Sequence, residues 1–127
     1  MTRRPLLLLP LLLTIACASP SGGGPGAPNT IGMTDTLKFA PVSMTVARGT
    51  TVTFRNTTPI PHTVTDDPSK PTNPADATLP GGVQPWDSGN MDPGQTFTHT
   101  FDTPGEYRYF CVPHEVAGMV GTITVTP

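Results

Sequence analysis

The chain has 127 residues and a formal net charge of −2 at pH 7, with 13% charged and 6% aromatic residues. This length fits one small domain, and the weakly acidic balance excludes a nucleic-acid-binding surface built on basic residues. The 17 prolines and 13 glycines lie between short alternating apolar runs, which favours a turn-rich all-β domain over disorder.

Residues 1–16 are predicted to form a signal peptide. Two arginines precede the apolar stretch LLLLPLLLTIA, which is too short to span a bilayer. The stretch ends just before Cys17 in a pattern that resembles the lipobox of bacterial lipoproteins, although Thr14 stands where leucine is usual. We expect Cys17 to be lipidated and residues 17–29 to form a flexible Gly/Pro/Ser linker anchored to a membrane.

The alternative is cleavage after Ala18, within an A-x-A pattern, which would release a soluble protein. Either route takes the chain out of the cytoplasm, to the periplasm or the cell surface. Cys17 is then used by the anchor or lost with the signal, so Cys111 has no disulfide partner. A free thiol is a liability in an oxidising compartment, and either inert burial or a bound metal would explain it.

From residue 30 to residue 127 we expect one domain of seven or eight short strands, packed as a β-sandwich. Its strands should lie, in chain order, at residues 37–39, 44–46, 50–56, 62–65, 95–101, 106–111 and 119–126. No internal repeat and no amphipathic helix is visible.

Residues 66–94 carry turn chemistry without a helical period, and such a long loop is expected to be functional or partly mobile. Three of its apolar side chains are expected to pin it to the core: Val83, Trp86 and Met91. Three carboxylates are expected on its solvated surface, with an acidic docking face as the alternative: Asp66, Asp67 and Asp76.

The segment YRYFCVPHEVAGMVGTITV contains three side chains that bind soft or borderline metals. Cys111 is followed by His114 three positions later and by Met119 after five more. Thiolate and imidazole are strong ligands, and a thioether suits copper far better than zinc. This combination predicts a copper site, which needs one further histidine.

Two other histidines are available. His62 lies in the sequence PIPHTV, at the mouth of a predicted strand and beside prolines that fix its backbone. His99 lies in the middle of a predicted strand between two phenylalanines, as expected of a core or half-buried residue. We therefore choose His62.

The segments FAPVSMTVARGTTVTFRNTTPIPHTV and GQTFTHTFDTPGEYRYFCVPHEVAGMVGTITV resemble the cupredoxins, the blue copper proteins of the plastocyanin, pseudoazurin and halocyanin type. The resemblance covers nearly the whole mature domain, and its C-x-x-H-x-x-x-x-M motif is highly specific. It implies a Greek-key β-sandwich with one type 1 copper ion near one end. The implied ligands are His62, Cys111, His114 and Met119.

The resemblance also implies residues that support the ligands. Asn56 ends the strand that precedes the first histidine. Thr63 stands where plastocyanins often have an asparagine that ties the ligand loops together, and its backbone N–H is the expected donor to the Cys111 sulfur. Pro113 lacks an N–H and cannot donate a second hydrogen bond to that sulfur.

The implied function is a one-electron carrier that cycles between Cu(I) and Cu(II). Its partners would be redox proteins outside the cytoplasm, such as a cytochrome, a membrane oxidoreductase complex or a reaction centre. The four ligands leave no open position for a substrate, so we expect a monomeric carrier and not an enzyme. The alternative is a copper-binding or copper-delivery protein without redox cycling.

An apolar surface around the second histidine is the expected docking site for those partners. Its expected members are Pro59, Ile60, Pro61, Val112, Pro113, Val116 and Ala117. Glu115 departs from this apolar rim and adds a charge beside His114, which would favour a basic partner or raise the affinity of that histidine for protons.

Overall fold

The computed structural model describes residues 27–127. The predicted signal peptide (1–16), the predicted lipidation site Cys17 and most of the predicted linker lie outside the described residues. Two of the last three linker residues already hydrogen-bond to the domain, since the carbonyls of Ala27 and Asn29 accept from Thr30 and Thr53 at 3.2 and 2.9 Å. Within residues 27–127 no helix has the length and apolar character needed to cross a membrane.

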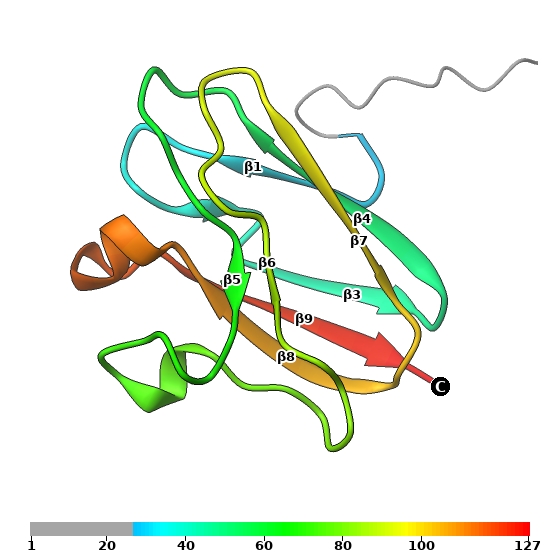
Figure 1. Ribbon diagram of the computed structural model, residues 1–127. Helices are drawn as coiled ribbons and strands as arrows, with labels where there is room; N and C mark the ends of the chain where they lie inside the picture. Colours follow the sequence, from blue (N-terminus) through cyan, green and yellow to red (C-terminus); the bar gives the residue numbers. More distant parts are fainter. Residues whose placement is uncertain (1–26) are drawn as a thin grey trace, which may run out of the picture.

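Two mixed sheets face each other (Figure 1), which confirms the predicted all-β sandwich. The first sheet has the order β2-β1-β4-β7 and contains β1 (Thr30–Met33), β2 (Phe39–Ala40), β4 (Thr50–Asn56) and β7 (Thr96–Phe101). The second has the order β3-β9-β8-β5-β6 and contains β3 (Ser43–Ala47), β5 (Thr65–Asp66), β6 (Trp86–Asp87), β8 (Gly105–Phe110) and β9 (Val120–Thr126). The described residues form nine strands, close to the seven or eight expected, and β2 and β6 are only two residues long.

The core forms because the long strands alternate apolar and polar side chains. Val52 and Phe54 on β4 are fully buried in the same core cluster as Tyr107 and Tyr109 on β8. The Tyr109 ring meets Phe54 edge-on, with ring centroids 5.3 Å apart. Full burial of each such side chain stabilises the fold by about 1.5–3 kcal/mol. The apolar faces of β4 and β8 therefore pack into the core.

Gly121 permits a close approach within the second sheet. It lies opposite Tyr109 in the β8–β9 ladder, and the Tyr109 ring occupies the space that a Cβ at position 121 would need. A larger residue would therefore displace a fully buried aromatic side chain.

The long loop is anchored as predicted but is more buried than predicted. Trp86 and Met91 are buried and Val83 packs against the core. The loop contains a 3-10 turn, η1 (Pro74–Asp76). The prediction that Asp66 and Asp76 are solvated is wrong, because they are 0% and 8% exposed.

Asp66 is a buried carboxyl group in the sandwich. It lies opposite Trp86 in the β5–β6 pair. Neither of its carboxyl oxygens has a hydrogen-bond partner within the described part of the chain. Burial, with a smaller contribution from the charge of Asp67, raises the pKa of Asp66 from 3.8 to about 8. The side chain is therefore held mainly in its neutral form at pH 7.

We predict that Asp66→Asn weakens the pH dependence of stability. The folded state keeps the Asp66 proton between pH 4 and pH 8 while the unfolded state loses it, so this group stabilises the fold fully at low pH and progressively less toward pH 8. The slope from one such group is at most about 1.4 kcal/mol per pH unit. Asparagine keeps the shape without the proton equilibrium, so the variant gains stability relative to wild type as pH rises.

Urea unfolding of the metal-free protein at a series of pH values measures this effect. Asp35→Asn, at an exposed position, is the matched control. Equal slopes for wild type and Asp66→Asn between pH 4 and pH 8 would show that Asp66 is not held neutral.

Candidate metal centre

The pairing of β5 with β8 brings two distant segments of the chain together. Thr65 on β5 lies opposite Phe110 on β8. His62 precedes β5, and its backbone N–H and carbonyl pair with the carbonyl and N–H of Met91 at 3.1 and 2.8 Å. Cys111 follows β8 directly. The expected strand at residues 62–65 is therefore only partly correct, because His62 forms an isolated bridge before β5 begins.

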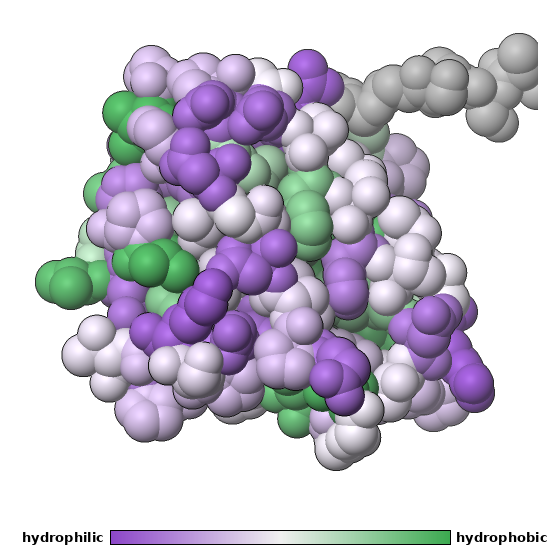
Figure 2. All heavy atoms as spheres, viewed as in Figure 1, coloured by the Kyte–Doolittle hydropathy of each residue, from purple (hydrophilic) through white to green (hydrophobic). Residues whose placement is uncertain are grey.

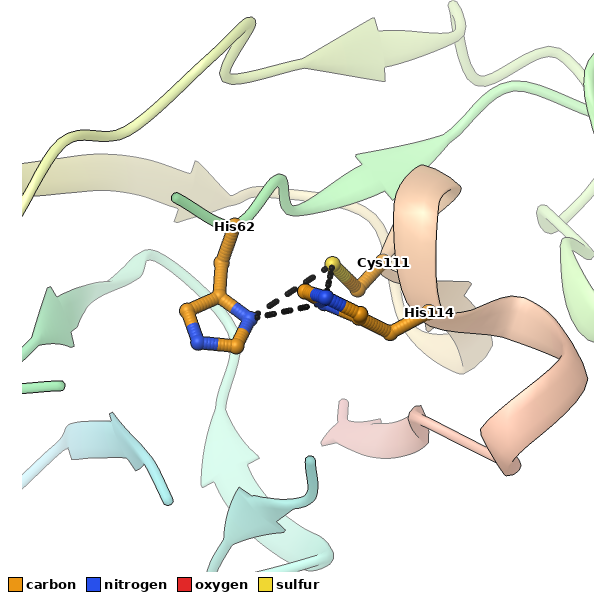
Figure 3. Close-up of side chains that lie close together, drawn as sticks. All are labelled: His62, Cys111 and His114. Carbon is orange, nitrogen blue, oxygen red and sulfur yellow. Dashed lines mark hydrogen bonds between the residues drawn. The ribbon is translucent and has the colours of Figure 1, made fainter. Parts of the chain in front are cut away.

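Three of the predicted ligand side chains converge (Figure 3). His62 Nδ1 lies 3.7 Å from Cys111 Sγ and 3.2 Å from His114 Nδ1, and Cys111 Sγ lies 3.3 Å from His114 Nδ1. Metal bonds of about 2.0 Å to nitrogen and about 2.3 Å to sulfur in one trigonal plane require separations of about 3.5 Å between nitrogens and about 3.7 Å between nitrogen and sulfur. The observed triangle is close to this size, so the three side chains fit one metal ion.

The environment of the donors also suits a metal. His62 and Cys111 are fully buried, and His114 is partly exposed. Burial, assisted by the nearby charge of His114, lowers the pKa of His62 and favours the neutral imidazole that binds metals. Burial raises the pKa of the Cys111 thiol, against the lowering effect of the Thr63 N–H. Metal binding would therefore release the thiol proton.

Met119, the predicted fourth ligand, is fully buried and follows His114 by five residues. Its carbonyl accepts from the Cys111 N–H at 3.0 Å, and its N–H donates to the His114 carbonyl at 3.3 Å. These bonds hold the backbone of Met119 against both neighbouring ligands. The role of its thioether remains a prediction.

A hydrogen-bond network built on Asn56 and Thr58 orients His62. The Asn56 amide donates to the carbonyls of Ile60 and Met91 at 2.8 and 2.9 Å. Its oxygen accepts from the Thr58 N–H and hydroxyl at 3.0 and 2.8 Å. Asn56 therefore closes the turn that precedes His62.

Thr58 selects the tautomer of His62. Its hydroxyl has a single proton and lies near two acceptors, Asn56 Oδ1 at 2.8 Å and the Ile60 carbonyl at 3.1 Å. The hydroxyl oxygen therefore accepts from His62 Nε2–H at 2.9 Å. This leaves the Nδ1 lone pair free to face the other two ligands. Sequence reasoning missed Thr58, because no spacing rule marks it.

Thr63 joins the two ligand segments. Its N–H donates to Cys111 Sγ at 3.3 Å, which is the expected hydrogen bond, and its hydroxyl accepts from the Val112 N–H at 2.8 Å. The hydroxyl also contacts Thr65 Oγ1 at 3.0 Å. Threonine thus ties the loops in this chain. Pro113 has no N–H for the sulfur, as expected.

His114 lies on a short 3-10 segment, η2 (Val112–Ala117), at one end of the sandwich (Figure 1). Glu115 does not project freely beside it. Its carboxylate accepts from the N–H groups of Asn73 and Thr72 at 2.8 and 3.0 Å. These two hydrogen bonds lower the pKa of Glu115. The Glu115 carboxylate, which we expected to add a charge beside His114, therefore binds the backbone of the long loop.

Apolar side chains project from the surface at this end. Val116 is completely exposed, Val112 is 43% exposed and Ile60 is 37% exposed. The other expected members of the docking surface, Pro59, Pro61 and Ala117, are exposed as well. Figure 2 shows hydrophobic atoms protruding at the left edge, where Figure 1 places η2.

His99 is not part of the centre. It is partly buried on β7 and stacks on Trp86 with ring centroids 4.5 Å apart, as expected for a strand residue. Across residues 27–127, the cluster of His62, Cys111 and His114 is the only group of three or more histidine, cysteine or carboxylate ligands close enough to share a metal.

Comparison with known proteins agrees with this geometry. The family model for copper binding proteins of the plastocyanin/azurin family matches residues 27–126. The plastocyanin of Scenedesmus fuscus is 42% identical over 93 residues, covering 70% of this chain and 87% of that protein. The chloroplastic plastocyanin of Physcomitrium patens is 36% identical over 123 residues, covering 91% of this chain, and this chain spans only 63% of that protein's length.

Solved structures share the fold. A purple cupredoxin from Nitrosopumilus maritimus superposes with a TM-score of 0.59 at 25% identity, covering 76% of this chain and 98% of that chain. A copper-containing nitrite reductase from Thermus scotoductus superposes with a TM-score of 0.61 at 26% identity, covering 77% of this chain and 22% of that chain. The site can hold one copper ion, and the chain belongs to the plastocyanin/azurin family of copper-binding proteins.

Proposed function

We propose that this protein is a one-electron carrier that uses one type 1 copper ion to shuttle electrons between redox partners outside the cytoplasm. The proposed ligands are His62, Cys111, His114 and Met119. The observation that supports this best is the triangle of two imidazole nitrogens and one sulfur, 3.2–3.7 Å apart, assembled from two distant segments. Bound copper supplies the Cu(I)/Cu(II) couple.

The protein's contribution is to hold the donors in one arrangement. Cys111 supplies a thiolate whose sulfur receives one backbone hydrogen bond from Thr63. Thr58 fixes the tautomer of His62, and the buried surroundings exclude water from that side. Donors that are already fixed need to move little when the charge of the metal changes, which favours fast electron transfer.

A carrier is favoured over an enzyme by the donor set. Two imidazoles, a thiolate and a thioether would fill the coordination positions and leave none open for a substrate. The nitrite reductase among the structural relatives is an enzyme, but this chain corresponds to only 22% of it. Similarity to that protein therefore indicates the shared fold and not its reaction.

The exposed apolar end beside η2 is the proposed docking surface. His114 is partly exposed there, next to the exposed side chains of Val112 and Val116. An apolar patch of this kind supports brief contacts that bring a partner's redox centre close to the metal. Cytochromes, membrane oxidoreductase complexes and reaction centres are the candidate partners.

We predict that the protein becomes intensely coloured when loaded with Cu(II), because the Cys111 thiolate gives a charge-transfer absorption. A mild reductant should bleach the colour and an oxidant should restore it over repeated cycles. Cys111→Ser should bind copper without the intense band. Weak colour in the wild type, or rapid transfer of copper to a competing chelator, would instead support a copper-delivery protein without redox cycling.

We predict that Thr58→Val weakens copper binding about 10- to 100-fold, the usual effect of losing a partner that orients a metal ligand. Valine leaves the buried His62 Nε2–H without an acceptor, which also lowers the stability of the metal-free protein by about 1–3 kcal/mol. Thr58→Ser keeps the hydroxyl and should stay near wild type. A competition titration with a copper chelator measures the affinity, and equal values for the valine and serine variants would contradict the assigned tautomer.

We also propose that Cys17 anchors the carrier to a membrane, with residues 17–29 as the tether. The support is the sequence pattern around residues 14–17. The intact mass of the protein from the membrane fraction should show a lipid on residue 17, and Cys17→Ser should lose it and appear in the soluble fraction. A mass that matches cleavage after Ala18 would exclude the anchor.

A further inference from the structure

We propose that Lys38 and Glu115 are a pair of positioning residues that clamp the ligand segment from opposite sides. The ligand segment is defined here as residues 112–119, which carry His114 and Met119. This inference rests on the proposed copper function for its consequence, but the hydrogen bonds of the clamp join only groups of the chain itself.

Glu115 attaches the first half of the ligand segment to the long loop. Its two carboxylate oxygens accept separate backbone hydrogen bonds, from Asn73 at 2.8 Å and from Thr72 at 3.0 Å. Hydrogen bonds to a charged acceptor are stronger than those between neutral groups. The long loop is in turn fixed, since Asn73 caps η1 by accepting from Ala75 at 3.2 Å, and Asp76 lies 3.7 Å from Arg108.

Lys38 attaches the second half of the ligand segment to the β1–β2 hairpin. Its ammonium group donates to the carbonyl of Ala117 at 2.7 Å and to that of Gly118 at 3.3 Å. The Ala117 carbonyl is the last one of η2, where carbonyls have no partner within the helical turn, whereas the Gly118 carbonyl also accepts from the Val120 N–H at 3.0 Å. A lysine at this position gives the Ala117 carbonyl a partner and is favoured by the local dipole.

The hairpin that presents Lys38 is itself constrained. Leu37 has a φ of +58°, a left-handed conformation that leucine rarely adopts and that costs about 1 kcal/mol or more. Thr34 holds the turn, because its carbonyl accepts from Leu37 at 3.0 Å and its N–H donates to the Lys38 carbonyl at 2.9 Å. Such a conformation persists only where the surroundings fix it, so Lys38 comes from a rigid turn.

The two anchors belong to different sheets. Lys38 directly precedes β2 of the first sheet, whereas Thr72 and Asn73 lie between β5 and β6 of the second. The ligand segment is thus tied to both layers of the sandwich by oppositely charged side chains. Such a clamp restrains rotation and translation of the segment, and so fixes His114 and Met119 relative to Cys111.

Amide hydrogen exchange of the metal-free protein tests the clamp directly. Lys38→Met and Glu115→Ala should each increase exchange at the amides of residues 118–120 by roughly three- to tenfold, the loss expected for charge-assisted hydrogen bonds at a surface. The double variant should exceed either single variant, and Lys38→Arg should restore slow exchange. Arg48→Met and Glu106→Ala, exposed positions outside the ligand segment, are the matched controls.

Copper-loaded variants test the consequence. Lys38→Met should change the relative strengths of the thiolate-to-copper absorption bands, whereas Arg48→Met, with the same loss of charge, should not. Exchange at residues 118–120 that matches the controls would overturn the clamp. If exchange rises as expected but wild-type protein shows no intense copper band, the clamp stands and the proposed copper function fails.

Discussion

The metal centre depends on one short register, the pairing of β5 with β8. Thr65 lies opposite Phe110, so the chain running back to His62 meets the chain running forward to Cys111. Side chains alternate along a strand, and a slip of one residue would turn the cysteine away from the imidazoles. Because β5 has only two residues, the register needs the two bonds that Thr63 makes to the Cys111 sulfur and the Val112 N–H. The same hydrogen bonds therefore hold the sheet and shape the site.

The rest of the site is built by fixing each donor through a different part of the fold. Asn56 and Thr58 close the turn before His62. The hydrogen bond from the Cys111 N–H to the Met119 carbonyl closes the ligand segment. Lys38 then connects that segment to the opposite sheet. Each donor is thus held in place by a different part of the fold, and donors that move little when the charge of a metal changes are what the proposed electron carrier needs.

The sequence predicted well whatever depends on local pattern. The alternation of apolar and polar side chains in residues 50–56 and 106–111 predicts strands with one buried face. The spacing of Cys111 and His114 predicts two metal ligands on one loop. Contacts across the fold were not predictable in this way. Asp66 looks like a turn residue but is buried in the sandwich, and Lys38 binds a carbonyl that only the tertiary structure brings near. Thr58 lies only four residues before His62, but no sequence pattern marks its hydrogen bond to that ring. The two-residue strands β2 and β6 are too short to show a period.

The most direct test of the central claim is X-ray absorption at the copper edge of the loaded protein. We expect the copper ion to be coordinated by two imidazole nitrogens and one sulfur at a short distance, and to lose that sulfur in Cys111→Ser. Copper coordination without sulfur in the wild type, or with a single imidazole, would contradict the convergence of His62, Cys111 and His114 on one copper ion.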